Sequence, residues 1–333
     1  PRSTLFPYTT LFRSHRLKKI LSKEIRSKRA LDLIVHSLLT PTTSDNVNKK
    51  MRKIFFDNEK GVPQGLSISN ILASIYLQGV DNEMLKFDVT YYRYVDDVLM
   101  YGNYDDVNSA YHSLRRRLKY RGLNTHPPSS PKTHLGFLNE SFSFLGYVFK
   151  ENVITVRDST VESFMKSIAS RFSDYLHNKN KRLNKYTHLT SDDLKDIFLE
   201  ELNDKLTGAI SEKKRYGWVA YYSNINDLSL LHKIDFIISE MFKRLDDFDN
   251  CAPEGLKKVA RAYYEMKFSP HRGYIRDYDQ IKTIKQKTEF LHRRGRIAEG
   301  ERLTKEQVEE RYERYKAKNL ASMQADEGEV YPK

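Results

Sequence analysis

The chain has 333 residues, which is long enough to bury a sizeable core in two or more domains. Its single cysteine excludes an internal disulfide and a cysteine-built zinc site, and it suits a reducing, cytoplasmic compartment. The mean hydropathy is −0.67, and no apolar run approaches the ~20 residues of a membrane span, so we expect no membrane partner. The net charge of +13 suits a polyanion, although histones and ribosomal proteins share that property.

The first residues do not have the pattern of a natural folded segment. Residues 5–14 read Leu-Phe-Pro-Tyr-Thr-Thr-Leu-Phe-Arg-Ser, which is one translation of a widely used sequencing adapter. Such a segment is set aside from fold reasoning in the same way as an expression tag. We therefore treat residues 1–14 as foreign and expect the natural sequence to start near His15.

The segment from Arg16 to Leu39 has apolar residues at steps of three and four, which predicts an amphipathic helix ending before Pro41. Basic residues outnumber acidic ones from Arg16 to Lys53. This flank either meets a nucleic-acid backbone or is a solvated helix face, and the pattern alone does not separate the two.

Two motifs follow. The first is Gly-Val-Pro-Gln-Gly over residues 61–65, a glycine-bracketed loop that leads into an apolar helix start at Ile71. The second spans Tyr91–Gly102, where two short β-prone runs flank the adjacent carboxylates Asp96 and Asp97, which is the pattern of a hairpin with acids at its tip. An Asp-Asp pair alone would be an ordinary solvated turn. The two motifs in this order are far more specific than either one alone.

Together these motifs resemble the reverse transcriptases, in particular the bacterial retron and group II intron-like branch. The resemblance covers about Arg16 to Lys243 and implies an α+β right-hand polymerase fold. An incomplete palm, an antiparallel sheet with helices, would occupy residues 15–157, a helical thumb 158–250, and a basic helical extension 251–333. The implied activity is RNA-directed DNA synthesis by nucleotidyl transfer. Its partners would be deoxynucleoside triphosphates, an RNA template or structured noncoding RNA, and the DNA product; the oligomeric state is open.

The resemblance also assigns roles to individual residues. Asp96 and Asp97 would be catalytic and would bind two Mg²⁺ ions, which stabilise the attacking and leaving oxygens of phosphoryl transfer. A helix is expected over Val107–Tyr120. In the family, the loop after this helix carries a lysine near the bound triphosphate, and Lys132 would be that lysine; the alternative is that Lys132 is an ordinary surface lysine. A hairpin expected over residues 141–156 would form the primer grip. The nucleotide-binding residues would be Pro63, Gln64, Gly65 and Lys132, and the primer-grip residues Phe144, Leu145, Gly146 and Tyr147.

The family uses a further metal-binding aspartate on its first palm strand, about ten residues before a histidine that His15 matches. That position falls near Leu5, inside the foreign segment, and no acidic residue occurs before Glu24. We therefore expect this chain to bind metal weakly and to be inactive, although its intact parent would be an enzyme.

Three biological roles are consistent with these motifs. The chain lacks the Val-Thr-Gly of retron enzymes and the zinc-binding or nuclease motifs that many intron maturases append. This favours a free-standing enzyme of phage defence that works with a noncoding RNA. A group II intron maturase and a catalytically dead RNA-binding scaffold are the alternatives.

The remainder of the chain is predicted to be helical. Helical periodicity dominates from Val161 to Arg244, with Trp218 expected in the core. Residues 257–296 hold twelve basic against four acidic residues, which predicts an RNA-binding surface; the alternative is a charge-mixed extension packed on the thumb or another subunit. Residues 303–320 have few apolar positions and are expected to pack weakly, and the residues from Ala321 are expected to fray. The residues expected to contact RNA include Tyr263, Tyr264, Phe268, Tyr274, Arg293, Arg294 and Arg296.

Overall fold

The computed structural model describes residues 14–38, 68–130, 132–269, 271–298 and 300–327. The chain divides into two compact units, Pro1–Gly136 and Phe137–Lys333. The boundary expected between palm and thumb, after residue 157, therefore falls within the second unit, and the domain assignment itself stays a prediction. Helices combine with small, mostly antiparallel sheets, which fits the expected α+β class. Among the described helices, none is both long and apolar enough to cross a membrane.

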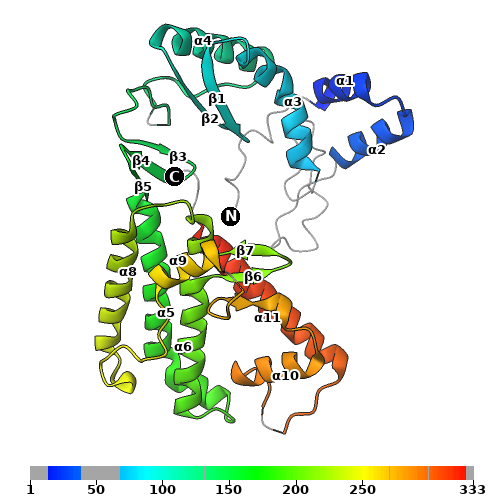
Figure 1. Ribbon diagram of the computed structural model, residues 1–333. Helices are drawn as coiled ribbons and strands as arrows, with labels where there is room; N and C mark the ends of the chain where they lie inside the picture. Colours follow the sequence, from blue (N-terminus) through cyan, green and yellow to red (C-terminus); the bar gives the residue numbers. More distant parts are fainter. Residues whose placement is uncertain (1–13, 39–67, 131, 270, 299, 328–333) are drawn as a thin grey trace. The chain divides into compact units, whose positions relative to one another are not determined.

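The described part of the first unit consists of four helices and one hairpin (Figure 1). In α3 the buried residues recur every three or four positions from Leu72 to Met84, and they form a core with leucines from the other helices. Tyr91, Val98 and Met100 of the hairpin pack against that core. The elements are α1 (Ser14–Glu24), α2 (Lys28–Leu38), α3 (Ser69–Met84), β1 (Val89–Tyr94), β2 (Asp97–Gly102) and α4 (Tyr104–Tyr120).

The single helix expected from Arg16 to Leu39 is wrong, because α1 and α2 are separate helices. Ser27 lies at the break, and its Oγ accepts a hydrogen bond from the amide of Ala30 at 3.3 Å, which is a helix-capping contact. The apolar spacing continues across the break, and leucines from both helices are buried in the same core. Periodicity alone therefore did not reveal the break.

The second unit combines a three-stranded meander, a small second sheet and a helical body (Figure 1). In the second sheet, β6 pairs antiparallel with β7 and parallel with β8. Short 3₁₀ turns, η2 (Phe242–Arg244), η3 (Asp246–Phe248) and η4 (Tyr278–Gln280), link the longer elements. These are β3 (Phe142–Phe144), β4 (Tyr147–Lys150), β5 (Val153–Val156), α5 (Asp158–Lys185), α6 (Ser191–Thr207), β6 (Ala209–Ser211), β7 (Lys214–Tyr216), α7 (Trp218–Tyr221), α8 (Leu228–Met241), α9 (Val259–Phe268), β8 (Arg276–Asp277), α10 (Ile284–Arg293) and α11 (Lys305–Asp326).

Aromatic side chains fill the centre of the second unit. Trp218 is buried, as predicted, and stacks on Phe164 with ring centroids 4.9 Å apart. Phe172 meets Phe198 and Phe242 edge to face, at centroid distances of 5.3 and 5.0 Å. These contacts join α5, α6, α7 and η2 into one core, since large aromatic rings bury more apolar area than other side chains.

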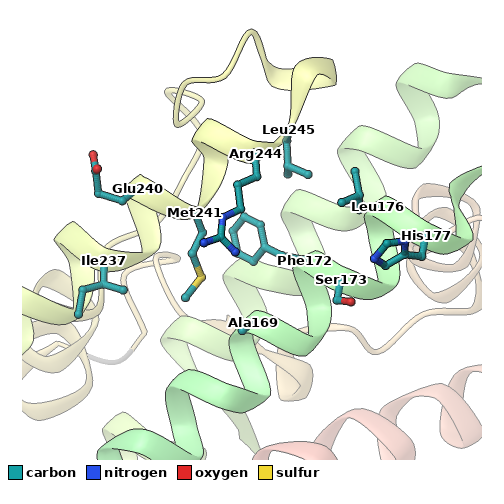
Figure 2. Close-up of a pocket in the computed structure, with 10 residues that line it drawn as sticks. All are labelled: Ala169, Phe172, Ser173, Leu176, His177, Ile237, Glu240, Met241, Arg244 and Leu245. Atoms are coloured by element: carbon teal, nitrogen blue, oxygen red, sulfur yellow. The ribbon is translucent and has the colours of Figure 1, made fainter.

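A cavity of about 360 Å³ opens between α5 and α8 (Figure 2). Its walls are mainly apolar and include Phe172, Leu176 and Met241. Figure 2 shows Arg244, which follows α8, among the side chains that line the cavity. Glu240 is the one carboxylate in the lining, so this cavity does not offer the paired acids that metal-dependent phosphoryl transfer needs.

The expectation that residues 303–320 pack weakly is wrong, and so is the expected fraying from Ala321 as far as Glu327, the last described residue. Helix α11 extends to Asp326, and Val308, Tyr312 and Met323 are buried in a core with α10 and η4. Asp326 accepts a hydrogen bond from buried Lys205 of α6, and both side chains are shielded from solvent. Helix α11 has few aliphatic residues, and it is attached to the rest of the unit by aromatic contacts and by this ion pair.

The expected RNA contact at Arg294 is also wrong. The Arg294 side chain is 0% exposed and lies between two acids of α6, with Nε 2.9 Å from a Glu200 oxygen and Nη2 2.6 Å from an Asp204 oxygen. Arg276 of β8 makes a second contact to Asp204, at 3.3 Å. These arginines pair with buried Asp204 and half-buried Glu200, so they are unavailable to a nucleic-acid backbone.

Replacing Arg294 by alanine is expected to lower the free energy of unfolding of the second unit by about 3–5 kcal/mol, because buried Asp204 would keep only the longer contact to Arg276 and Glu200 would lose its nearer cation. Trp218, the only tryptophan, is buried in this unit, so its fluorescence during denaturant unfolding measures the change. The matched control is Arg293→Ala at the neighbouring exposed position, expected to change stability by less than about 0.5 kcal/mol. Equal losses in both variants would contradict this role for Arg294.

Candidate active site

The two candidate catalytic carboxylates lie at the tip of the β1–β2 hairpin. Tyr94 and Asp97 form the last antiparallel pair, so Val95 and Asp96 make a two-residue turn. Val95 has a φ of +55°, a left-handed conformation that is strained for a β-branched residue. Asp96 and Asp97 are both half-buried. The predicted hairpin is therefore confirmed, and the catalytic role of its acids stays a prediction.

An acid from α3 holds this turn. Arg93 Nε donates to Asp81 Oδ1 at 2.7 Å, and Arg93 Nη2 donates to Asp81 Oδ2 at 2.5 Å, which is a bidentate pairing. The third guanidinium nitrogen, Nη1, donates to the carbonyl of Val95 at 2.8 Å. Tyr91 also donates to Asp81 Oδ1, at 2.9 Å. We call Asp81, Tyr91 and Arg93 the Asp81 clamp, because together they tie the strained turn to the helix.

The charges within the Asp81 clamp are balanced. The hydrogen bond to Asp81 raises the pKa of Arg93, which keeps the guanidinium charged. Burial, followed by the negative charge of Asp81, raises the pKa of Tyr91, which keeps the phenol neutral and able to donate. Asp81 is thus neutralised by Arg93, so it does not add an unpaired negative charge near the aspartates of the turn.

Strand alternation gives the hairpin two different faces. Val98 and Met100 face the core, so Asp97 lies on the opposite face, together with Tyr92, Tyr94, Leu99 and Tyr101. The three tyrosines on this face are exposed, and the rings of Tyr92 and Tyr101 are 6.4 Å apart. The hairpin therefore presents aromatic surface beside one of its two acids.

The structure describes one of the four predicted nucleotide-binding residues. Pro63, Gln64 and Gly65 lie outside the described residues. Lys132 is exposed in a turn of the first unit, where its amide donates to Ser130 Oγ at 3.3 Å. The assignment of these residues to a nucleotide pocket stays a prediction.

The primer-grip residues belong to the second unit. Phe144 ends β3 and Tyr147 begins β4, and the turn between them has Leu145 at φ +53° and Gly146 at φ +82°. Positive φ at both positions is the type I′ geometry that suits a tight hairpin. Tyr147 Oη donates to the carbonyl of Tyr221 at 2.5 Å. The turn is thus anchored to α7, and its contact with a primer stays a prediction.

The sequence analysis did not identify the structural role of Arg93, which holds the turn through Asp81 and Val95. In the register of β1, Arg93 shares the inward face with Tyr91, opposite Val98 and Met100. A charge on the buried face of a strand requires a partner, since an unpaired buried ion is costly. That signal pointed to an acid on a neighbouring element, and Asp81 is that acid.

The hairpin acids can hold a metal ion only in a limited way. Within the part of the chain that the structure describes, no group of three or more His, Cys, Asp or Glu side chains is placed to bind a metal. Mg²⁺ often takes one or two carboxylates and completes its shell with substrate phosphates and water. Asp96 and Asp97 fit that pattern, so they would hold Mg²⁺ together with a bound nucleotide.

Hydrogen exchange of the hairpin tests the Asp81 clamp. Replacing Arg93 by glutamine removes both the bidentate contact and the bond to Val95, so the free energy of opening of residues 89–102 should fall by about 1.5–3 kcal/mol. Asp81→Asn should cause a similar loss. The double variant should lose little more than either single variant, because both remove the same contact.

The control for this test is Lys86→Gln. Lys86 pairs with Glu83 on α3 at 3.0 Å but is largely exposed, so removing it should leave exchange in the hairpin unchanged. Fully additive losses in the Arg93 and Asp81 variants would mean that the two side chains stabilise the turn independently.

A glycine pair tests the anchoring of the primer-grip turn. A Cβ at Gly146 would lie 2.8 Å from Tyr222 Oη, whereas one at Gly273, with a similar φ of +86°, would meet no atom within 4 Å. Gly273→Ala should therefore cost only about 1 kcal/mol of backbone strain, and Gly146→Ala about 1–3 kcal/mol more. Trp218 fluorescence during denaturant unfolding measures both. Adding Tyr222→Phe should recover part of the extra loss; no recovery would contradict the contact.

Comparison with known proteins agrees with the motifs. Residues 14–149 match the family model described as reverse transcriptase (RNA-dependent DNA polymerase). The matched segment runs from α1 to β4 and includes the Asp81 clamp and the hairpin acids. A search of curated proteins finds no match. The family match supports a reverse transcriptase, which is the family that the two sequence motifs resemble.

Proposed function

We propose that this protein is an Mg²⁺-dependent RNA-directed DNA polymerase in which Asp96 and Asp97 are the metal ligands. The observation that carries the proposal is the placement of these two carboxylates at the tip of one hairpin, inside the segment that matches the reverse transcriptase model. Adjacent carboxylates on a short turn can share a cation, which relieves their mutual repulsion.

In this proposal the residues of the first unit have different roles. When bound, Mg²⁺ stabilises the charge that develops on the attacking and leaving oxygens. Asp96 and Asp97 supply its protein ligands, and the Asp81 clamp keeps the turn in its strained conformation. Pro63, Gln64, Gly65 and Lys132 would bind the nucleotide, by resemblance to the family.

The number of carboxylates affects the rate that we expect. Asp96 and Asp97 are joined by no third metal-binding group within the described residues. With two protein ligands from the described residues, the ion would depend on nucleotide phosphates for the rest of its shell, so metal binding should be weak without a nucleotide. We propose that polymerisation by this chain is correspondingly slow or absent, since placement of the ion contributes several kcal/mol to phosphoryl transfer.

The wider biological role is part of the same proposal and rests on resemblance. An RNA template or a structured noncoding RNA, deoxynucleoside triphosphates and a DNA product would be its partners. The primer terminus would lie against Phe144, Leu145, Gly146 and Tyr147. That role would be phage defence, which rests on the family resemblance.

Asp96→Asn tests the assignment through metal binding and catalysis. The substitution keeps the size of the side chain and removes its charge, so the affinity for Mn²⁺, used as a spectroscopic substitute for Mg²⁺, should fall about tenfold or more in the presence of a deoxynucleotide. Electron paramagnetic resonance of free Mn²⁺ measures this affinity. Any extension of a primed RNA template that the unsubstituted chain supports should fall to background in the same variant.

The matched control is Asp105→Asn, an exposed acid in the first turn of α4, which should leave Mn²⁺ binding unchanged. Because Mn²⁺ binding is measured without turnover, the test remains decisive even if the unsubstituted chain extends primers slowly. Unchanged Mn²⁺ affinity in Asp96→Asn would overturn the assignment. Rapid cDNA synthesis by the unsubstituted chain would contradict only the proposed weakness of the two-carboxylate site.

A further inference from the structure

Two exposed aromatic side chains stand on one face of α9 in the second unit. Tyr264 is 46% exposed and Phe268 is 69% exposed, and their rings lie 6.3 Å apart at an angle of 25°. They are four residues apart, so they are neighbours on the helix surface. Two large rings that are exposed side by side lose the free energy that burial would contribute. Such exposed pairs often mark a binding surface.

The other aromatic residues of this region are already engaged within the protein. Tyr263 is buried, and its hydroxyl donates to the carbonyl of Ile225 at 2.5 Å. Tyr274 is covered by Arg261, whose guanidinium lies 4.2 Å from the ring centroid. Of the four aromatic residues that the sequence suggested for base stacking, only Tyr264 and Phe268 therefore present exposed rings.

Helix α9 holds these rings on a rigid support. Its first turn is capped by Asp235 of α8, which accepts from the amides of Val259 at 2.6 Å and Ala260 at 3.1 Å. The opposite face of the helix is buried, including Ala262 and Met266. A fixed pair of rings loses little conformational entropy when a ligand stacks on it.

The surroundings of the two rings are strongly basic. Arg261 and Lys267 are exposed on α9, and Lys267 Nζ lies 5.8 Å from the centroid of Phe268. The segment 258–272 contains four exposed basic residues and one acidic residue, Glu265, which lies 3.7 Å from Arg261. Cations beside flat apolar rings complement a chain that has anionic phosphates and stacking bases, and that chain is a single-stranded nucleic acid.

We propose that Arg261, Tyr264, Lys267 and Phe268, here called the α9 face, bind single-stranded nucleic acid. Bases stack on Tyr264 and Phe268, and phosphates lie near Arg261 and Lys267. Binding at the α9 face involves no metal or polymerisation step, so it goes beyond the proposed polymerase activity and does not depend on it.

Fluorescence anisotropy with two labelled oligonucleotides tests the proposal. One is a 12-nucleotide oligoadenylate RNA, and the other has the same backbone and charge but no bases; neither assay contains divalent metal or nucleotide. Each base–aromatic stack contributes about 1–3 kcal/mol, so the oligoadenylate should bind about tenfold or more tightly than the abasic strand. A DNA oligoadenylate shows whether the sugar matters.

Two double variants separate stacking from charge. Tyr264→Leu with Phe268→Leu keeps apolar side chains on α9 but removes the rings, so it should abolish the preference for oligoadenylate and leave abasic binding unchanged. Arg261→Gln with Lys267→Gln should weaken binding of both strands. It should also reduce the slope of log K against log salt by about 1.4, because each single-strand phosphate that the protein no longer neutralises lowers the slope by roughly 0.7.

The matched control is Phe236→Leu, because Phe236 is 65% exposed on α8 of the same unit. This variant should retain the preference for oligoadenylate, and Trp218 fluorescence should confirm that every variant is folded. An unchanged preference in the double leucine variant would overturn the proposal. Unchanged binding together with an altered oligomeric state in light scattering would also overturn it, and would assign the α9 face to protein–protein contact.

Discussion

The bidentate contact between Arg93 and Asp81 is the interaction on which the candidate active site depends. It joins a helix to a strand, and the same guanidinium also holds the carbonyl of the strained residue Val95. A two-residue turn with a valine at positive φ is not stable by local preference alone. The conformation of the turn, and therefore the direction of its two carboxylates, is determined by a tertiary contact. This is how strain persists at functional sites, where surrounding contacts compensate for it.

The second unit uses its positive charges differently. Helix α6 carries Glu200, Asp204 and Lys205, and each of these pairs with a residue from the last sixty positions of the chain that the structure describes. Basic residues that would suit an RNA surface instead hold the C-terminal elements against α6. Only the cations that remain at the surface, such as those of the α9 face, can contribute to the polyanion affinity that the net charge predicts. Net charge thus describes the whole chain but does not locate the binding surface.

Local patterns predicted the local structure well. The hairpin around Asp96 was predicted from its alternating pattern, and most of α4 was predicted from its sequence, although the helix begins at Tyr104 and not at the expected Val107. The break at Ser27, the packing of α11 and the burial of Arg294 were not predicted, because each depends on contacts that the apolar spacing and the charge count do not reveal. The family resemblance located the acids of the hairpin. The resemblance did not indicate which contacts position these acids. The role of Arg93 becomes evident only when the strand register shows that its side chain faces inward.

The attachment of α11 links the final fold to the order in which the chain is synthesised. Lys205 lies 121 positions before its partner Asp326, and the amide of Gly217 donates to Glu327. Translation proceeds at about 5–20 residues per second, so on a ribosome the centre of this unit would wait several seconds or more for those partners. During that interval Lys205 and the backbone near Gly217 are without their final contacts, and contacts between such distant residues slow folding. The second unit can therefore complete the contacts of Lys205 and Gly217 only after Glu327 has left the ribosome.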